Sequence, residues 1–76
     1  MFERIKTILV NDLHVEASEV TLEAELINDL GVNSLELADL VVLCEERFGI
    51  IFDESDLPTL LTVGDVVAYL EAKTQA

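Results

Sequence analysis

The sequence predicts an all-α fold: a small helical bundle of three main helices plus a short helical turn, with a long loop after the first helix. In three separate segments, apolar residues recur every three to four positions, which is the period of a helix with one buried face. Residues that favour helix N-termini precede two of these segments. The one short apolar run that resembles a strand, residues 50–52, has no partner strand.

The first predicted helix runs from about Phe2 to Leu13. Its apolar residues share one face, which we assign to the core: Phe2, Ile5, Ile8, Leu9 and Leu13. His14, the only histidine, follows this helix, where a cation complements the helix dipole. We therefore expect His14 to be a surface or capping residue.

Between His14 and Gly31 the helical period is lost over a long connection. A connection of this length inside a compact domain is usually an ordered loop or a functional one. We expect five apolar residues in it to point inward as anchors: Val15, Val20, Leu22, Leu26 and Leu30.

The second predicted helix runs from Ser34 to about Phe48. Asn33 is a favourable N-cap, and the Glu36 carboxylate can reach back to the Asn33 N–H. Gly49 supplies the left-handed residue that ends the helix. We assign one apolar stripe of this helix to the core: Leu37, Leu40, Val41, Cys44 and Phe48.

The opposite side of the second helix mixes acidic and apolar residues. Its acids are Glu36, Asp39 and Glu46. Leu35 and Val42 project among them, and Leu43 lies at the edge of the core stripe. Single exposed apolar residues are common, but this group beside Ser34 indicates a docking face.

After Gly49, residues 50–52 are expected to form an extended loop packed on the bundle. One helical turn is predicted from Glu54 to Leu57, limited by Pro58.

Thr62 and Asp65 form the second predicted N-cap pair. The last helix then ends near Lys73 and has a clear apolar stripe of Val63, Val66, Val67 and Leu70. Residues 74–76 are expected to fray.

Length and charge restrict the function. The chain has 76 residues and a formal net charge of -12, so we expect one domain, residues 1–76, without a deep catalytic cleft. Such a surface repels phosphate backbones and anionic lipids, which argues against nucleic acid or membrane partners and favours a basic patch on another protein. We expect a cytoplasmic monomer, because one cysteine, no signal peptide and no apolar run of roughly 20 residues are present.

Few residues offer catalytic or metal chemistry. Cys44 is the only cysteine and lies among leucines, where a free thiol behaves as a small buried hydrophobe. The acidic loop from Asp53 lacks the glycine and glutamate of a hand-type calcium loop. We therefore expect no catalytic residue and no metal site beyond weak binding of divalent ions.

Ser34 is the remaining candidate. Its context, GVNSL, does not match the G-x-S-x-G motif of hydrolases, and serine is often merely tolerated in a first helical turn. However, a helix N-terminus presents unpaired N–H groups and a partial positive charge. It is therefore a favourable place for a phosphate attached to the Ser34 hydroxyl.

Residues 29–35, DLGVNSL, resemble the modification signature of acyl carrier proteins, D-L-G-x-[D/N]-S-L. The likeness continues through the loop anchors Val20, Ala24 and Leu26, the CEERFG of residues 44–49 and the TVGDVVAYL of residues 62–70. Residues 20–70 align without gaps. The resemblance implies the acyl-carrier type of helical bundle.

The resemblance also implies that Ser34 carries a 4'-phosphopantetheine arm, transferred from coenzyme A by a phosphopantetheinyl transferase. Acyl groups would be held as thioesters on the arm during fatty acid or related polyketide biosynthesis. The chain would be a non-catalytic carrier serving synthases, reductases, dehydratases and acyltransferases with basic docking patches. Asn33 and Leu35 would flank the attachment site.

By the same resemblance, six residues would bind partners: Leu35, Glu36, Asp39, Val42, Glu45 and Glu46. The acids would steer the chain onto basic patches, which raises encounter rates more than affinity. The apolar interior, lined by Leu40, Phe48, Ile50 and Val66, could shelter a growing acyl chain.

Four positions depart from the family pattern. Asn33 replaces the usual aspartate, Pro58 falls in the short third helix, Leu61 is commonly polar and Leu43 is larger than usual. Two alternatives therefore stay open. A specialised aminoacyl or peptidyl carrier would share Ser34 and the arm but be loaded by a different ligase, whereas an unmodified docking or adaptor protein would not need Ser34.

Overall fold

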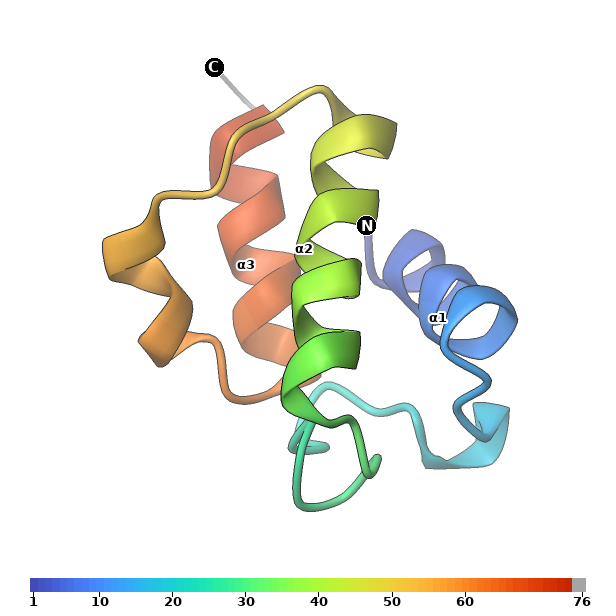
Figure 1. Cartoon of the computed structure of the whole chain (residues 1–76). Coiled ribbons are helices and arrows are strands. Elements are labelled where there is room, and N and C mark those ends of the chain that lie inside the picture. The colour runs from blue at the N-terminus through green and yellow to red at the C-terminus, as the bar shows by residue number, and fades with distance from the viewer. Residues whose placement is uncertain (75–76) are drawn as a thin grey trace.

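Three α-helices form the bundle in the computed structural model, which describes residues 1–74. They are α1 (Phe2–Asp12), α2 (Ser34–Phe48) and α3 (Val63–Thr74) (Figure 1). Two short 3-10 helices, η1 (Ala17–Glu19) and η2 (Glu54–Thr59), lie in the connections. Because α1 packs against both α2 and α3, the predicted all-α bundle is confirmed.

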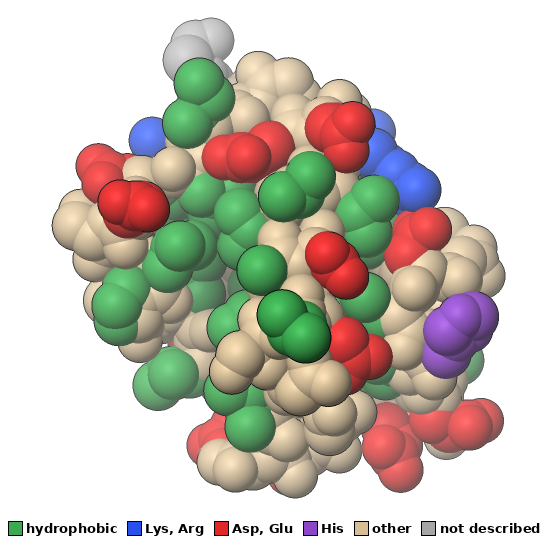
Figure 2. Space-filling view, in the orientation of Figure 1, with side chains coloured by type: hydrophobic (Ala, Val, Ile, Leu, Met, Phe, Trp, Pro, Cys, Tyr) green, Lys and Arg blue, Asp and Glu red, His purple; other side chains and the backbone are tan. Residues whose placement is uncertain are grey.

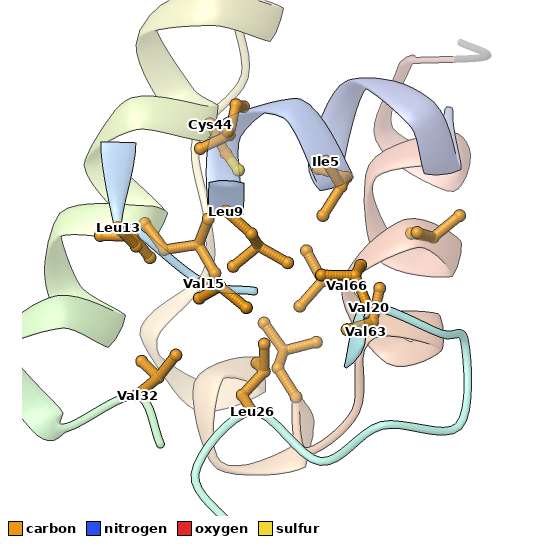
Figure 3. Packing of buried hydrophobic residues seen from close by; sticks show 14 of the residues in the cluster. Ile5, Leu9, Leu13, Val15, Val20, Leu26, Val32, Cys44, Val63 and Val66 are labelled. Atoms are coloured by element: carbon orange, nitrogen blue, oxygen red, sulfur yellow. The ribbon is translucent and has the colours of Figure 1, made fainter. Parts of the chain in front are cut away.

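The core is one cluster of buried apolar side chains from all three α-helices and the long loop (Figure 3). Ile5 and Leu9 of α1 meet Val63 and Val66 of α3, and Cys44 of α2 lies beside them. Within residues 1–74, no polar or charged side chain is buried. Burial of apolar surface therefore supplies most of the cohesion.

The predicted apolar stripe of α3 is buried, whereas that of α2 is only partly so. Leu40 and Cys44 are fully buried, but Leu37, Val41 and Phe48 are half-buried. On α1, Ile5, Ile8 and Leu9 are buried and Phe2 is half-buried; Leu13, just after the helix, is also buried.

The long loop is pinned along its length. Four of the five predicted anchors lie inward: Val15, Val20, Leu26 and Leu30. The prediction is wrong for Leu22, whose side chain is 47% exposed, because its backbone carbonyl faces α3 and accepts a hydrogen bond from the Gly64 N–H at 2.8 Å. A Cβ on Gly64 would lie only 2.9 Å from that carbonyl oxygen, so glycine permits this approach.

Three backbone hydrogen bonds join the loop to the start of α3, and we call them the loop–α3 seam. Their donor and acceptor pairs are Leu26 N to Leu61 O at 3.0 Å, Val63 N to Ala24 O at 3.0 Å and Gly64 N to Leu22 O at 2.8 Å. The seam includes an isolated antiparallel bridge between Glu25 and Thr62. It brings two distant segments of the chain into register.

Some predicted boundaries shift by a residue or two. The first helix ends at Asp12 rather than Leu13; the exposed His14 that follows has a left-handed φ of 59°. At the other end, α3 continues to Thr74, whose hydroxyl donates to the Leu70 carbonyl at 2.8 Å. The expected fraying is therefore wrong for Thr74, while residues 75–76 lie outside the described part.

Residues 50–52 after α2 form neither helix nor strand, as predicted for a loop, and Phe52 is buried. The short turn is longer than predicted, because η2 runs to Thr59 and includes Pro58. Proline fixes φ near -65°, which lies within the range of a 3-10 helix, so Pro58 does not end this element.

No helix in the described part of the chain has the length and apolar character needed to cross a membrane.

Asp65 caps the start of α3. Its carboxylate accepts hydrogen bonds from the N–H groups of Thr62 and Leu61, both at 3.0 Å, and the Thr62 hydroxyl accepts from the Asp65 N–H at 3.1 Å. These bonds favour the ionised carboxylate and hold the pKa of Asp65 below its ordinary value of 3.8.

Asp65→Ala is expected to lower the free energy of unfolding at neutral pH by about 1 kcal/mol, the usual value of a helix cap. Because the pKa of Asp65 is lower in the folded chain, this stabilisation is present above about pH 4 and is lost as the pH falls through the folded pKa. Urea unfolding should therefore show that the difference in free energy of unfolding between Asp65→Ala and the wild type becomes smaller as the pH falls. Glu71→Ala is the control, since it removes an exposed acid of the same helix and should change stability by less than about 0.5 kcal/mol. If this difference stays constant as the pH falls, the ionised Asp65 carboxylate does not stabilise the start of α3.

Candidate functional site

Ser34 is the first residue of α2, and its side chain is exposed. Two residues earlier, Val32 is buried and its N–H donates to the Leu26 carbonyl at 2.9 Å. Asn33 between them is extended. The Ser34 hydroxyl thus stands where an anchored loop turns into a helix.

The predicted capping box at the start of α2 is confirmed. The Asn33 side-chain oxygen accepts from the Glu36 N–H at 2.8 Å, and the Glu36 carboxylate accepts from the Asn33 N–H at 3.1 Å. Together they fix the first turn, whose remaining N–H groups and positive dipole end lie beside Ser34. This environment suits a phosphodiester on the hydroxyl, and the neutral Asn33 amide caps the helix without adding a negative charge next to it.

An apolar pocket of about 210 Å³ lies beside Ser34. Its walls come from α2, from the segment after α2 together with η2, and from α3. It is lined by Ser34, Leu37, Ala38, Leu40, Val41, Phe52, Leu57, Leu60 and Val66. Figure 2 shows hydrophobic side chains gathered on this face between α2 and η2. Because every lining side chain except that of Ser34 is hydrocarbon, the pocket suits an alkyl chain.

Of the four residues predicted to line the apolar interior around an acyl chain, two are confirmed. Leu40 and Val66 line the pocket, whereas Phe48 and Ile50 do not. Phe48 lies at the far end of α2, about 20 Å along the helix from Ser34, and its ring packs beneath the Arg4 guanidinium, 4.4 Å from the ring centroid. Ile50 follows at the same end of α2.

Sequence reasoning did not name six of the lining residues. Leu37, Ala38 and Val41 lie on α2, and the other three are Phe52, Leu57 and Leu60. These last three belong to the connection between α2 and α3, whose course has no periodic signal. The cue available in the sequence is that apolar residues punctuate this otherwise acidic connection.

One stripe along α2 is exposed and combines apolar with acidic side chains. It comprises Leu35, Asp39, Val42 and Glu46, at helical spacings of four and three, and we call it the α2 stripe. Leu35 is 79% and Val42 is 51% exposed, while Leu43 is half-buried at its edge. Acidic and hydrophobic side chains alternate over α2 in Figure 2.

The other two acids predicted to bind partners take part in the fold. Glu36 belongs to the capping box, and the Glu45 carboxylate accepts a hydrogen bond from the Phe52 N–H at 2.8 Å. Both residues are half-buried. They hold the N-terminus of α2 and the segment that follows it.

The remaining candidates lie away from Ser34. Cys44 is buried in the core, and this burial raises the pKa of its thiol to about 11, which leaves almost no reactive thiolate at neutral pH. His14 lies on the surface at the end of α1. Over residues 1–74, no group of three or more potential metal-ligating side chains is present.

Comparisons with known proteins identify the family of the chain. A family model described as "Phosphopantetheine attachment site" matches residues 3–70. The chain is 48% identical over 73 residues to a protein named acyl carrier protein from Thermotoga maritima, covering 96% of this chain and 90% of that protein. Proteins of the same name from Helicobacter acinonychis and Helicobacter pylori are 42% and 39% identical over 71 residues, which is 93% of this chain and 91% of each relative.

Proposed function

The chain belongs to the family of acyl carrier proteins, and on that premise we propose that Ser34 carries the 4'-phosphopantetheine arm. One observation supports this assignment above all others: Ser34 is exposed at the N-terminus of α2 and also lines the apolar pocket. A phosphate and an alkyl chain thus both find a suitable environment within reach of one hydroxyl.

When bound, the arm supplies a terminal thiol that holds an acyl group as a thioester. The residues of the chain itself bind and orient the arm and its acyl group. The first turn of α2 favours the phosphate charge. We propose that the chain is non-catalytic, since neither Cys44 nor His14 lies beside Ser34; the base that removes the Ser34 proton during attachment then belongs to the transferase.

The pocket gives the carrier its preference for acyl cargo. Each methylene transferred from water to an apolar environment gains about 0.8 kcal/mol, so the hydrocarbon walls favour a fatty acyl or reduced polyketide chain. An aminoacyl group would bring an ammonium into the same walls with no partner, which is costly. This difference supports fatty acid biosynthesis over the aminoacyl or peptidyl alternative.

The α2 stripe is the proposed docking surface. Leu35 and Val42 offer small apolar anchors, and Asp39 and Glu46 flank them with exposed negative charge. Arg and Lys patches on the phosphopantetheinyl transferase and on the synthases, reductases, dehydratases and acyltransferases of chain elongation would complement this pattern. Electrostatic steering gives fast encounters without tight binding, which suits a cytoplasmic, monomeric shuttle that visits several enzymes.

Ser34→Ala is expected to abolish the mass gain of one phosphopantetheine after incubation with coenzyme A and a broad-specificity phosphopantetheinyl transferase. Since Ser34 is exposed, the free energy of unfolding should change by less than about 0.5 kcal/mol. Intact mass and urea unfolding measure the two effects. Ser18→Ala, which removes another exposed serine, should be modified like the wild type. A modified Ser34→Ala protein would contradict the assignment, and an unmodified wild type would favour the adaptor alternative.

Asp39→Lys combined with Glu46→Lys should slow association with the transferase at low salt by about tenfold, because it reverses the charge that steers docking. The difference in association rate from the wild type should be smaller at high salt. Stopped-flow association measures both effects. Glu36 is left unchanged because its carboxylate caps α2.

The matched control is Glu19→Lys combined with Glu71→Lys, which makes the same change in net charge on η1 and α3. If both double variants slow association equally, overall charge rather than the α2 stripe governs docking, and the proposed surface is wrong.

A further inference from the structure

The side chain of Tyr69 holds the wall of the pocket formed by residues 50–57, which we call the wall segment. The Tyr69 hydroxyl on α3 accepts a hydrogen bond from the Asp53 N–H and donates one to the Asp56 carboxylate, both at 3.0 Å. Its ring stacks on that of Phe52, with centroids 4.9 Å apart and planes 14° from parallel. Phe52 and Leu57, the neighbours of Asp53 and Asp56 along the chain, both line the pocket. Tyr69 itself does not.

The wall segment is tied at two points. The Glu45 carboxylate on α2 accepts from the Phe52 N–H at 2.8 Å, and Tyr69 on α3 holds the next N–H, that of Asp53. Residues 50–53 thus cross from α2 to η2 (Figure 1), held to α2 through Glu45 and to α3 through Tyr69. Within residues 1–74, the hydrogen bond from Tyr69 to Asp56 is the one that joins η2 to an α-helix.

We propose that Tyr69 is a positioning residue that keeps the outer wall of the pocket closed over a bound acyl chain. It acts through Phe52 and η2, so its hydroxyl controls how well the cargo is sheltered. This inference rests on the proposed function, because the cargo in question is the acyl group carried at Ser34.

The hydrogen bonds of Tyr69 are strong enough to hold the wall segment closed and weak enough to let it open. A six-residue 3-10 helix has little stability of its own, and segments with few buried contacts open locally far more often than the whole domain unfolds. The Tyr69 hydroxyl, which bridges the Asp53 N–H and the Asp56 carboxylate, therefore shifts the equilibrium between the closed and open positions of residues 52–57. Its loss opens the pocket and leaves the core of Ile5, Leu9 and Leu70 intact.

Cleavage of the loaded thioester by hydroxylamine measures this opening. The hydroxylamine nitrogen attacks the thioester carbonyl and loses a proton, the carbon–sulfur bond breaks, an acyl hydroxamate leaves, and the departing thiolate of the arm takes up a proton to become the free thiol. Acetyl and octanoyl forms are prepared with the transferase and the corresponding acyl-coenzyme A, and intact mass follows the loss of the acyl group. The acetyl form is the reference for a thioester whose chain is too short to fill the pocket.

In the wild type the octanoyl thioester should be cleaved more slowly than the acetyl thioester. Tyr69→Phe keeps the stacked ring and removes the hydroxyl. It should raise the octanoyl rate by at least about fivefold, because it removes two hydrogen bonds and the loss of one ordinary hydrogen bond changes an opening equilibrium by about that factor, and it should leave the acetyl rate unchanged. Asp56→Ala should raise the octanoyl rate similarly, and the double variant should add little, because the two residues share one interaction.

Thr7→Val is the matched control. It also removes one hydroxyl hydrogen bond, from Thr7 to the Glu3 carbonyl at 2.9 Å, but on α1 and away from the pocket. The ratio of octanoyl to acetyl rates should equal that of the wild type.

Three results would overturn the inference: an unchanged rate ratio in Tyr69→Phe, equal octanoyl and acetyl rates in the wild type, or an equal rise of both rates in Tyr69→Phe. The last would show a general loss of stability. Failure of the proposed function is distinguishable from these, because the intact mass would then show no arm on the wild-type protein, and the inference would fall with it.

Discussion

The loop–α3 seam is the constraint on which the rest of the structure depends. Its hydrogen bond between the Leu26 N–H and the Leu61 carbonyl fixes both residues. The Leu26 carbonyl in turn holds Val32 just before the helix that carries Ser34, and Leu61 follows Leu60 in the pocket wall. Three backbone hydrogen bonds thus place the attachment residue and the far wall of the pocket relative to each other. A chain of this size has one thin core, and such a seam supplies order that side-chain burial alone would not.

Two sets of acidic residues differ in what their carboxylates do. Glu36, Glu45 and Asp65 accept hydrogen bonds from backbone N–H groups and hold helix starts or the segment after α2. Asp39 and Glu46 remain exposed among apolar side chains on α2. A net charge of -12 costs stability by self-repulsion, and the capping acids offset part of that cost locally. The same composition therefore serves both the fold and the docking surface.

The sequence predicts what depends on neighbours along the chain and misses what depends on distant contacts. The bounds of α2, its capping box and the position of Ser34 follow from local periodicity and capping, and all were correct. The inward direction of Leu22 was wrong because a tertiary hydrogen bond uses its carbonyl. Of the four predicted lining residues, Leu40 and Val66 were correct and Phe48 and Ile50 were not, because the path of residues 50–60 is set by the seam and by Tyr69. No local pattern reveals that a hydroxyl sixteen residues later holds the Asp53 N–H.

The most direct measurement of the central claim is the contact between cargo and pocket in the loaded protein. An octanoyl group labelled with carbon-13 and attached through the arm should show nuclear Overhauser contacts from its methylenes to the methyl groups of Leu40 and Val66. That result would place the acyl chain in the pocket beside Ser34. Contacts to Phe48 and Ile50 instead, or none to the protein interior, would contradict the claim that this pocket shelters the cargo.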